Sequence, residues 1–218
     1  MPVIVADSVE HALAALAEHP DATLLAGGTD LMVEVNDGRR TPTQVIAVGR
    51  VAELTGIRVD GHAEGATIVI GAATTFARLE RGPITELAPA LAYAARTVGS
   101  PQIRNAATIG GNLATASPAG DSLPVLVALG ATIEVAGAND RRQIPIVEFF
   151  TGPKRSALAP GELVVAVHVP VRRGPQDYLK VGVRNAMVIA VASLAIAVDL
   201  DARTVGVGLV TELGRRSC

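Results

Sequence analysis

The sequence predicts a mixed α+β fold, with two lobes before residue 175 and the beginning of a further unit after it. Short segments rich in β-branched residues alternate with segments in which apolar residues recur at helical spacing. The chain has 218 residues, of which 49% are hydrophobic, and this length suffices to bury a sizeable core. The segment 172–175 (RRGP) is the best linker candidate, because Gly and Pro interrupt regular structure.

The first lobe is expected to cover residues 1–55 and to open with a strand, a helix and a second strand. Asp7 and Ser8 offer N-cap oxygens, and Glu10 stands three residues after Asp7 as in a capping box. Pro20 ends the helix. Thr29 and Asp30 are expected to cap a later helical turn. The expected strands are 3–5, 23–26 and 44–48, the expected helix is 9–19, and shorter turns cover 31–35 and 51–54.

The second lobe, residues 56–175, is expected to combine a sheet with several helices. Residues 100–107 are interpreted as a polar connection that follows Gly99, and 178–198 opens a new apolar segment. The expected strands are 57–59, 67–70, 131–136, 143–145, 163–169 and 204–210. The expected helices are 75–80, 84–98 and 123–129.

Composition excludes several classes of protein. A formal charge of −2, with no Trp and only 2% aromatic residues, argues against nucleic-acid binding. The single cysteine, Cys218, excludes a disulfide framework and a cysteine-held iron–sulfur cluster, and the four scattered histidines form no metal site. The most apolar stretch, 187–198, is about half of the ~20 residues that a bilayer span needs. Because the N-terminus also lacks a signal sequence, the expected location is cytoplasmic.

Two glycine pairs are the most informative motifs. They occur in the segments 26–30 (AGGTD) and 108–112 (TIGGN). Consecutive amides in a glycine turn form an anion-binding nest, and two nests suit a diphosphate. Thr29, Thr108 and Asn112 offer additional hydrogen bonds. The dinucleotide fingerprint and the P-loop lysine are both absent. In a chain with 22 glycines, two ordinary turns remain the alternative interpretation.

Longer segments extend these motifs, namely LLAGGTDLMVEVNDGRRTP (24–42), IGAATT (70–75), IRNAATIGGNLATASPAGDSLPVLVALGA (103–131), ELVVAVHVP (162–170) and YLKVGVRNAM (178–187). On these segments the chain resembles the FAD-binding subunit or domain of the molybdenum hydroxylases, which include aerobic carbon monoxide dehydrogenase and xanthine dehydrogenase. The resemblance implies a two-lobed FAD-binding domain of the PCMH (vanillyl-alcohol-oxidase-like) type in residues 1–175. An incomplete C-terminal α+β domain would then occupy residues 176–218.

The resemblance also implies a set of residues that bind FAD. The first loop would wrap the diphosphate, the second would contribute to the same site, and Val98 would lie near the adenine. Asp121 would accept hydrogen bonds from ribityl or ribose hydroxyls, while Val164 and Lys180 would approach the flavin. The implied residues are Leu24, Leu25, Ala26, Gly27, Gly28, Thr29, Asp30, Leu31, Val98, Thr108, Ile109, Gly110, Gly111, Asn112, Asp121, Val164 and Lys180. No catalytic side chain and no metal ligand is implied.

Two of these residues, and also Arg104, have a further or an alternative role. A cation near the flavin N1 or O2 would stabilise the reduced, anionic form, and Lys180 is the candidate. Asp121 is also placed to cap the helix that starts near Ser122. Arg104 is interpreted either as a counter-ion for cofactor phosphate or as part of an ordinary salt bridge.

As implied by the resemblance, the chain would pass electrons from iron–sulfur clusters of a partner subunit, through FAD, to NAD or a quinone. A further subunit would carry the molybdenum cofactor. The alternative is a truncated, non-redox scaffold copy that binds FAD weakly or not at all. A flavin oxidase is disfavoured, because no His or Cys lies beside either glycine pair for a covalent flavin link. The ending TELGRRSC departs from the family pattern, and a shortened lobe predicts low solubility or dependence on a partner.

Overall fold

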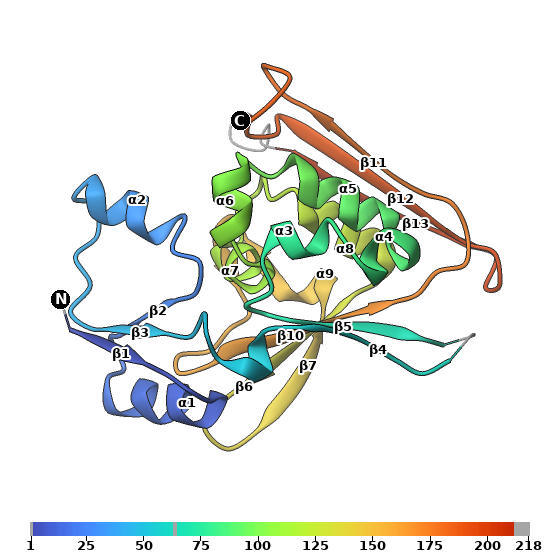
Figure 1. Ribbon diagram of the computed structural model, residues 1–218. Helices are drawn as coiled ribbons and strands as arrows, with labels where there is room; N and C mark the ends of the chain where they lie inside the picture. Colours follow the sequence, from blue (N-terminus) through green and yellow to red (C-terminus); the bar gives the residue numbers. More distant parts are fainter. Residues whose placement is uncertain (1, 63–64, 212–218) are drawn as a thin grey trace.

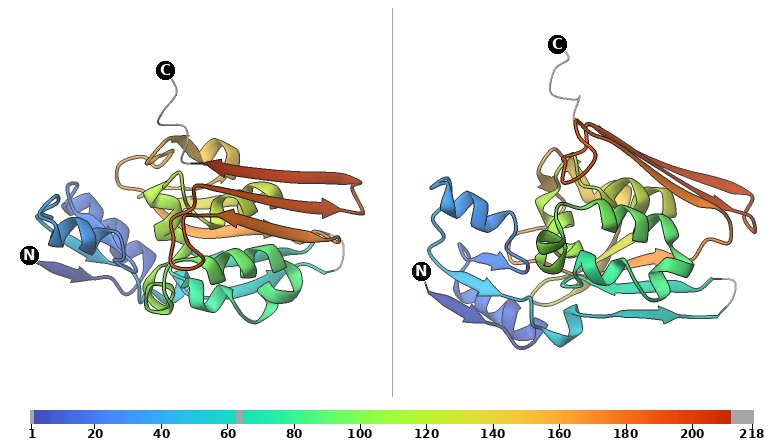
Figure 2. Two further views of the ribbon diagram at one scale, coloured as in Figure 1. Left: turned by 90° about the horizontal axis from the view of Figure 1, so that it is seen from above. Right: turned by 45° about the horizontal axis from the view of Figure 1, so that its top comes forward.

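The computed structural model describes residues 2–62 and 65–211, and its helices lie mainly in a layer between two antiparallel sheets (Figure 1). A smaller parallel sheet lies beside this sandwich, at the N-terminal end of the chain. The views in Figure 2 show the same arrangement of blue, green and red segments. The expected α+β character is therefore confirmed, while all but the first residue of the ending TELGRRSC, residues 212–218 with Cys218, lies outside the described residues.

The parallel sheet forms the first part of the chain and has the strand order β1-β3-β2. The buried face of α1 packs against it, with Val9, Ala12 and Leu16 joining Ile46 in one apolar cluster. The elements are β1 (Val3–Val5), α1 (Val9–Glu18), β2 (Thr23–Leu25), α2 (Leu31–Asn36), β3 (Val45–Ala47) and the 3₁₀ turn η1 (Ala52–Leu54). All of the elements expected in the first lobe are present.

The caps of these two helices differ from the expectation. Ser8 is the N-cap of α1, and its hydroxyl accepts a hydrogen bond from the amide of His11 at 3.0 Å. Asp7 instead bonds the ring of His11 at 2.9 Å, so the expected capping box between Asp7 and Glu10 is wrong. Asp30 occupies the N-cap position of α2 but makes no capping bond there. Its carboxylate is engaged by another element, as described below.

The five-stranded antiparallel sheet has the order β4-β5-β10-β6-β7. A small hairpin, β8–β9, follows it after the short helix α9. The bounds are β4 (Ile57–Asp60), β5 (Thr67–Gly71), β6 (Thr132–Ala136), β7 (Arg141–Pro145), α9 (Ile146–Phe149), β8 (Phe150–Gly152), β9 (Arg155–Ser156) and β10 (Leu163–Pro170). Long-range pairing of β10 with both β5 and β6 brings strands from distant parts of the chain into one sheet.

Six helices cover this sheet, and three of them correct the expectation for residues 84–107. The expected helix 84–98 is divided, because Pro89 disfavours helical geometry at Ala88, whose φ and ψ are −142° and 61°. The expected connection 100–107 contains a helix capped by Ser100, which accepts a bond from the amide of Ile103. The helices are α3 (Phe76–Leu79), α4 (Pro83–Leu87), α5 (Pro89–Thr97), α6 (Pro101–Ala106), α7 (Ile109–Thr115) and α8 (Ser122–Leu129).

A third sheet, β11-β12-β13, packs on the other side of the helices through α8 (Figure 1). Gly206 and Gly208 lie against the carbonyl oxygens of Ala128 and Pro124, where an added Cβ would stand 1.8 and 1.9 Å away. The strands are β11 (Gln176–Val181), β12 (Ala192–Asp199) and β13 (Thr204–Thr211). Residues 178–198 therefore form two strands and a loop rather than one apolar segment.

The outer face of this sheet carries exposed aliphatic side chains. Five of them retain more than half of their accessible surface: Leu179 (61%), Val181 (63%), Val205 (60%), Val207 (56%) and Leu209 (67%). The predicted low solubility was based on exposed apolar surface, and this face provides such surface. The solubility itself stays a prediction. Within the described ranges, every helix is too short or too polar to cross a bilayer.

Candidate functional site

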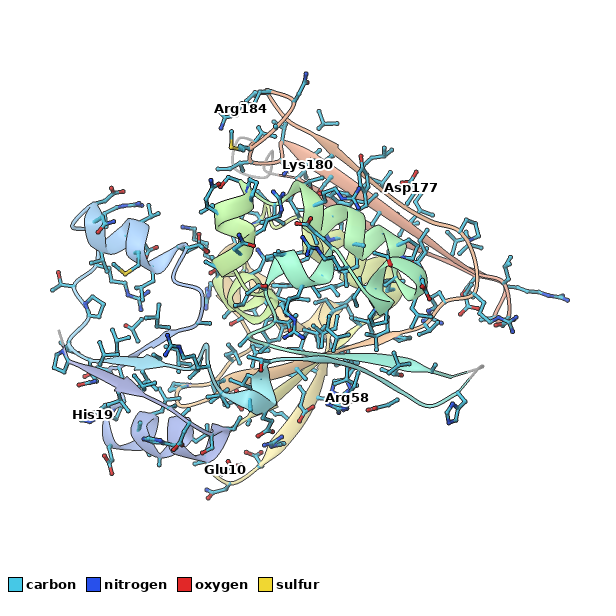
Figure 3. The ribbon with its side chains drawn as sticks, viewed as in Figure 1. Glu10, His19, Arg58, Asp177, Lys180 and Arg184 are labelled. Atoms are coloured by element: carbon cyan, nitrogen blue, oxygen red, sulfur yellow. The ribbon has the colours of Figure 1, made fainter. Side chains whose placement is uncertain are left out.

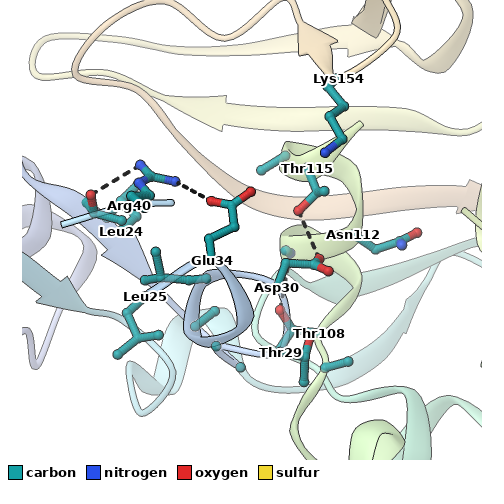
Figure 4. Close-up of a pocket in the computed structure, with 18 of the residues that line it drawn as sticks. Leu24, Leu25, Thr29, Asp30, Glu34, Arg40, Thr108, Asn112, Thr115 and Lys154 are labelled. Carbon is teal, nitrogen blue, oxygen red and sulfur yellow. Dashed lines mark hydrogen bonds and ion pairs between the residues drawn. The ribbon is translucent and has the colours of Figure 1, made fainter. Parts of the chain in front are cut away.

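A cavity of about 760 Å³ separates the parallel sheet and α2 from α7 and the β8–β9 hairpin (Figure 4). Both glycine-pair segments contribute to its wall, so residues far apart in the sequence meet there. Twelve of the predicted cofactor residues line it: Leu24, Leu25, Ala26, Gly27, Gly28, Thr29, Asp30, Leu31, Val98, Thr108, Gly111 and Asn112. Five predicted residues do not line it: Ile109, Gly110, Asp121, Val164 and Lys180.

The first glycine pair has the open backbone that anion binding requires. Gly28 has a φ of +72°, a conformation that favours glycine. An added Cβ at Gly27 would lie 2.0 Å from the carbonyl oxygen of Ala106, so this position brings the loop against the end of α6. Within the described part of the chain, the amides of residues 27–30 donate to no protein acceptor. Four consecutive free N–H groups therefore line the cavity wall, as in an anion-binding nest.

The second glycine pair does not form a nest, which corrects the expectation for residues 108–112. Thr108 is the N-cap of α7, and its hydroxyl accepts from the amide of Gly111 at 3.1 Å. The amides of Ile109 and Gly110 donate to the carbonyls of Thr74 and Ala72 at 3.0 and 2.8 Å. The amide of Asn112 donates to Thr108 within the helix. These N–H groups are already used, so this segment offers side chains to a ligand rather than amides.

The two glycines of the second pair have different roles. Gly110 is buried, and an added Cβ would lie 2.8 Å from the carbonyl oxygen of Ala72, so its small size permits close packing of α7 on the strand end. Gly111 lines the cavity, and an added Cβ would meet only the hydroxyl of Thr108, at 3.0 Å. Gly110 therefore shapes the core, whereas Gly111 keeps space open in the cavity.

Most charged groups of the cavity are paired with other protein groups. Asp30 accepts a hydrogen bond from the hydroxyl of Thr115 at 3.2 Å, and Arg40 lies 3.5 Å from Glu34 (Figure 4). Glu162 pairs with Arg142, which lies outside the cavity, at 2.9 Å. The guanidinium of Arg142 and the amide of Ala159 hold the pKa of Glu162 below its usual value.

Lys154 is the one unpaired cation among the described residues that line the cavity. Its backbone is left-handed, with a φ of 55°, and its amide donates to the carbonyl of Ala116 at 2.9 Å. The β8–β9 turn thereby holds Lys154 at the C-terminal end of α7. Sequence reasoning missed both Lys154 and Thr115, and only the Gly-Pro-Lys turn between two short strands signals Lys154.

Asp121 and Lys180 form a buried ion pair away from this cavity. Their charged atoms are 2.8 Å apart, and each side chain is 9% exposed. The hydroxyl of Tyr178 donates to the same carboxylate at 3.0 Å, and the ammonium group of Lys180 also donates to the carbonyl of Thr97. Burial raises the pKa of Asp121, against the opposing effect of Lys180. Asp121 makes no capping bond to α8, so its expected capping role is wrong.

Arg104 belongs to a salt bridge, as one of its two interpretations predicted. Its guanidinium lies 2.5 Å from the carboxylate of Glu80, and it donates to the carbonyls of Val98 and Gly99. These bonds fix the turn between α5 and α6, where Val98 faces the cavity. Among the residues that the structure describes, no group of three or more His, Cys, Asp or Glu side chains is arranged to hold a metal ion.

Comparison with known proteins gives consistent matches. The family described as "FAD binding domain in molybdopterin dehydrogenase" matches residues 1–172. The nicotinate dehydrogenase FAD-subunit of Eubacterium barkeri is 37% identical over 202 residues, which cover 89% of this chain and 67% of that protein. The carbon monoxide dehydrogenase medium chain of Hydrogenophaga pseudoflava is 38% identical over 165 residues, which cover 75% of this chain and 56% of that protein.

Solved structures match over almost the whole chain. A carbon monoxide dehydrogenase from Hydrogenophaga pseudoflava, lacking the Mo-pyranopterin moiety of its cofactor, superposes with a TM-score of 0.87 at 33% identity. The reconstituted CO dehydrogenase from Oligotropha carboxidovorans gives a TM-score of 0.89 at 28% identity. Each match covers 96% of this chain and 74% of the other, so the shared fold extends through the β11–β13 sheet.

Proposed function

The chain belongs to the family of FAD-binding domains in molybdopterin dehydrogenases, and from this membership we propose that it is the electron-transfer subunit of a molybdenum hydroxylase complex. It is an oxidoreductase subunit whose cofactor is FAD. In the proposed path, bound FAD passes electrons from iron–sulfur clusters of a partner subunit to NAD or a quinone. A further subunit with the molybdenum cofactor would oxidise the substrate.

The observation that carries this proposal is the run of free amides at residues 27–30 on the wall of the 760 Å³ cavity. Ligand cavities typically measure about 300–1,000 Å³, so the volume suits a large cofactor. Free N–H groups stabilise phosphate oxygens, and an L side chain at Gly28 would strain the loop that presents them. The residues present therefore fit the diphosphate of FAD.

The chain's own residues bind and orient the cofactor. The amides of residues 27–30 would hold the diphosphate, with hydroxyls from Thr29 and Thr108 and the amide group of Asn112 beside it. Val98 would contact the adenine through apolar surface. The leucines at 24, 25 and 31 line the same wall and would exclude water from the cofactor.

The five predicted residues outside the cavity are proposed to position its walls. Ile109 and Gly110 anchor the start of α7, and Val164 lies in β10 beneath the helices. Asp121 and Lys180 connect the start of α8 with β11. A direct contact of Asp121 or Lys180 with FAD, as the family resemblance implies, requires that the cofactor reach beyond this cavity.

We also propose the following organisation for the chain. Residues 1–175 form the FAD-binding domain of the PCMH type, with lobes at 1–55 and 56–175, and residues 176–218 begin the C-terminal domain. The parallel sheet and the five-stranded sheet support the two lobes, since they are separate sheets, and one apolar cluster joins a face of each. The proposed location is cytoplasmic.

The experiment is to add FAD to the purified full chain, remove free cofactor by gel filtration and record the visible spectrum. The wild type is expected to keep the flavin bands, whereas Gly111→Leu is expected to lose them because its side chain fills the cavity. Ala14→Leu, at an exposed position on α1 outside the cavity, serves as the control and should retain them. A folded wild-type chain without flavin bands would support the scaffold alternative instead.

A second measurement tests the electron path. In the complex isolated with its partner subunits, substrate should bleach the flavin bands within the catalytic turnover time. The isolated chain with FAD should show no bleaching on addition of the same substrate. Bleaching in the isolated chain would overturn the proposed division of labour.

A further inference from the structure

The proposed first lobe (1–55) rests on the five-stranded sheet of the second lobe (56–175) through an apolar contact. Val9 and Ile46 of the first lobe share one buried cluster with Val165 of β10. Apolar attraction is non-directional, so directional contacts at the edge of this cluster are needed to select one angle between the lobes. The angle matters, because the cavity lies between β2 and α2 of the first lobe and α7 and the β8–β9 hairpin of the second.

Arg141 connects the two lobes through ion pairs. Among the residues that the structure describes, the ion pairs that cross between the lobes are those of Arg141 with Glu53, at 2.7 Å, and with Glu10, at 3.7 Å. Arg141 is the first residue of β7 and lies opposite Ala136 of β6, which belongs to the apolar cluster. Figure 3 shows Glu10 at the end of α1 that faces the β6–β7 hairpin. The guanidinium group therefore lies at the edge of the contact between the lobes.

A third carboxylate anchors Arg141 within the second lobe. Glu134 of β6 lies 3.3 Å from the guanidinium group, and its other carboxylate oxygen lies 2.8 Å from Nε2 of His168 in β10. Less than a fifth of the side chain of either Glu134 or His168 is exposed. Because Glu134 is held from two sides, Arg141 is anchored on the five-stranded sheet while its remaining donors reach the first lobe.

We propose that Arg141 is a positioning residue for FAD, which sets the width of the cavity by fixing the angle between the lobes. The inference rests on the proposed function, in which groups of both lobes hold the diphosphate: the amides of residues 27–30 on one side, and Thr108 and Asn112 on the other. Neither Arg141 nor any of its three carboxylate partners lines the cavity. Arg141 therefore acts on the cofactor through the position of the lobes and not by contact.

The size of the effect follows from the population of lobe orientations. The affinity for a ligand falls in proportion to the fraction of molecules that have the binding orientation. A partly exposed ion pair shifts such an equilibrium by a factor of up to about five. Two pairs cross between the lobes, and the one with Glu53 is the shorter. Loss of the Arg141 side chain is therefore expected to weaken FAD binding by about fivefold.

The first test measures the FAD affinity of the full chain by quenching of flavin fluorescence. Arg141→Gln should weaken FAD binding by about fivefold, and Arg141→Lys, which keeps the charge, should restore part of the loss. Glu53→Gln should also weaken binding, and Arg141→Gln/Glu53→Gln should bind no more weakly than Arg141→Gln, because both changes remove the same contact. Arg58→Gln is the matched control and should leave the affinity unchanged, since its partner Asp60 lies 3.2 Å away in the same strand, β4.

A second measurement separates the position of the lobes from stability. Spin labels on Glu18→Cys of α1 and Glu86→Cys of α4, in a chain with Cys218→Ser, report the distance between the lobes by double electron–electron resonance. Glu18 and Glu86 are exposed and lie outside the cavity. Without FAD, Arg141→Gln should broaden the distance distribution relative to the wild type and to Arg58→Gln, and saturating FAD should narrow it again. A merely structural role would lower thermal stability without changing this distribution.

Two results would overturn the role of Arg141. They are an FAD affinity that Arg141→Gln leaves unchanged, and a distance distribution that is the same in Arg141→Gln and in the wild type. A wild-type chain that binds no FAD would instead overturn the proposed function. In that case the distance distribution of the cofactor-free chain still decides whether Arg141 fixes the angle between the lobes.

Discussion

The carboxylate of Asp121 and the ammonium group of Lys180 lie 2.8 Å apart, although 59 residues separate them in the sequence. Each side chain is only 9% exposed, and both have further partners in Tyr178 and Thr97. The pair connects the start of α8 with β11, and so it joins the helical layer to the third sheet. A buried pair with satisfied hydrogen bonds is costly to break from one side.

Lys180→Met is therefore expected to lower the free energy of unfolding by about 3–5 kcal/mol, because the carboxylate stays buried without its partner. Asp121→Asn/Lys180→Met should cost clearly less than the sum of the two single variants. Urea denaturation measures all three. Because neither residue lines the cavity, the folded variants should lose less FAD affinity than Gly111→Leu. Single-variant costs below about 1 kcal/mol would show that the pair behaves as a surface ion pair.

Gly28→Ala is expected to reduce FAD retention. A side chain at a φ of +72° costs about 1–2 kcal/mol, and relief of that strain would displace the free amides beside it. Gly38→Ala is the matched control, since Gly38 has a φ of +67° and lies outside the cavity with no atom within 4 Å of an added Cβ. Gly28→Ala should lose at least as much stability as Gly38→Ala in thermal unfolding, since its added Cβ would also lie 3.0 Å from Leu25, while only Gly28→Ala should lose flavin absorbance after gel filtration. Equal flavin content in both would contradict the proposed role of residues 27–30.

Lys154→Gln is expected to weaken FAD binding by about fivefold and to leave riboflavin binding nearly unchanged. The reason is that riboflavin lacks the diphosphate that the unpaired ammonium group would stabilise, and a partly exposed ion pair is worth about 1 kcal/mol. Quenching of flavin fluorescence gives both dissociation constants. Arg155→Gln, at the neighbouring position outside the cavity, is the control. The proposed contact between Lys154 and phosphate fails if both flavins lose affinity equally.

Glu162 makes a small and pH-dependent contribution to stability. Arg142 holds the pKa of Glu162 below its usual value, so the carboxylate is favoured in the folded state. The stabilisation is complete above the unfolded-state pKa of about 4.3 and is lost as the pH falls through the lower folded-state pKa. Glu162→Gln should therefore cost about 0–1 kcal/mol at pH 7, since Arg142 is 41% exposed, and progressively less as the pH falls toward 3. Urea midpoints across this pH range measure the difference, and a cost that grows on acidification would refute the assignment.

Most helices and strands could be predicted from the sequence, because local patterns of residues determine them. Helical spacing in residues 9–19 and β-branched segments such as 163–169 predicted α1 and β10 correctly. The break at Ala88 was missed although Pro89 signals it, since the apolar spacing continues across the break. The helix α6 was missed because Pro101 and Arg104 were interpreted as features of a loop, whereas Pro is favourable in a first helical turn.

The sequence indicated most of the residues that line the cavity, but not how their backbone groups are used. The glycine pairs indicated where the chain approaches a ligand, and twelve of the seventeen predicted residues line the cavity, while the remaining five do not. The different use of the two pairs depends on long-range partners, since the carbonyls of Ala72 and Thr74 take the amides of Gly110 and Ile109. The pairing of Asp121 with Lys180 depends on the docking of the third sheet, which no local pattern in the sequence specifies.

The two glycines of β13 determine where the third sheet packs against α8. Gly206 and Gly208 are two residues apart on a strand, and the carbonyls that they meet, at Ala128 and Pro124, are four residues apart on a helix. Two strand residues span about 6.6 Å and four helical residues about 6 Å, so the two spacings match closely. If β13 moved by one residue along α8, Val207 would meet a helix carbonyl, and no side chain fits there. The two glycines therefore fix the register in which β13 packs against α8.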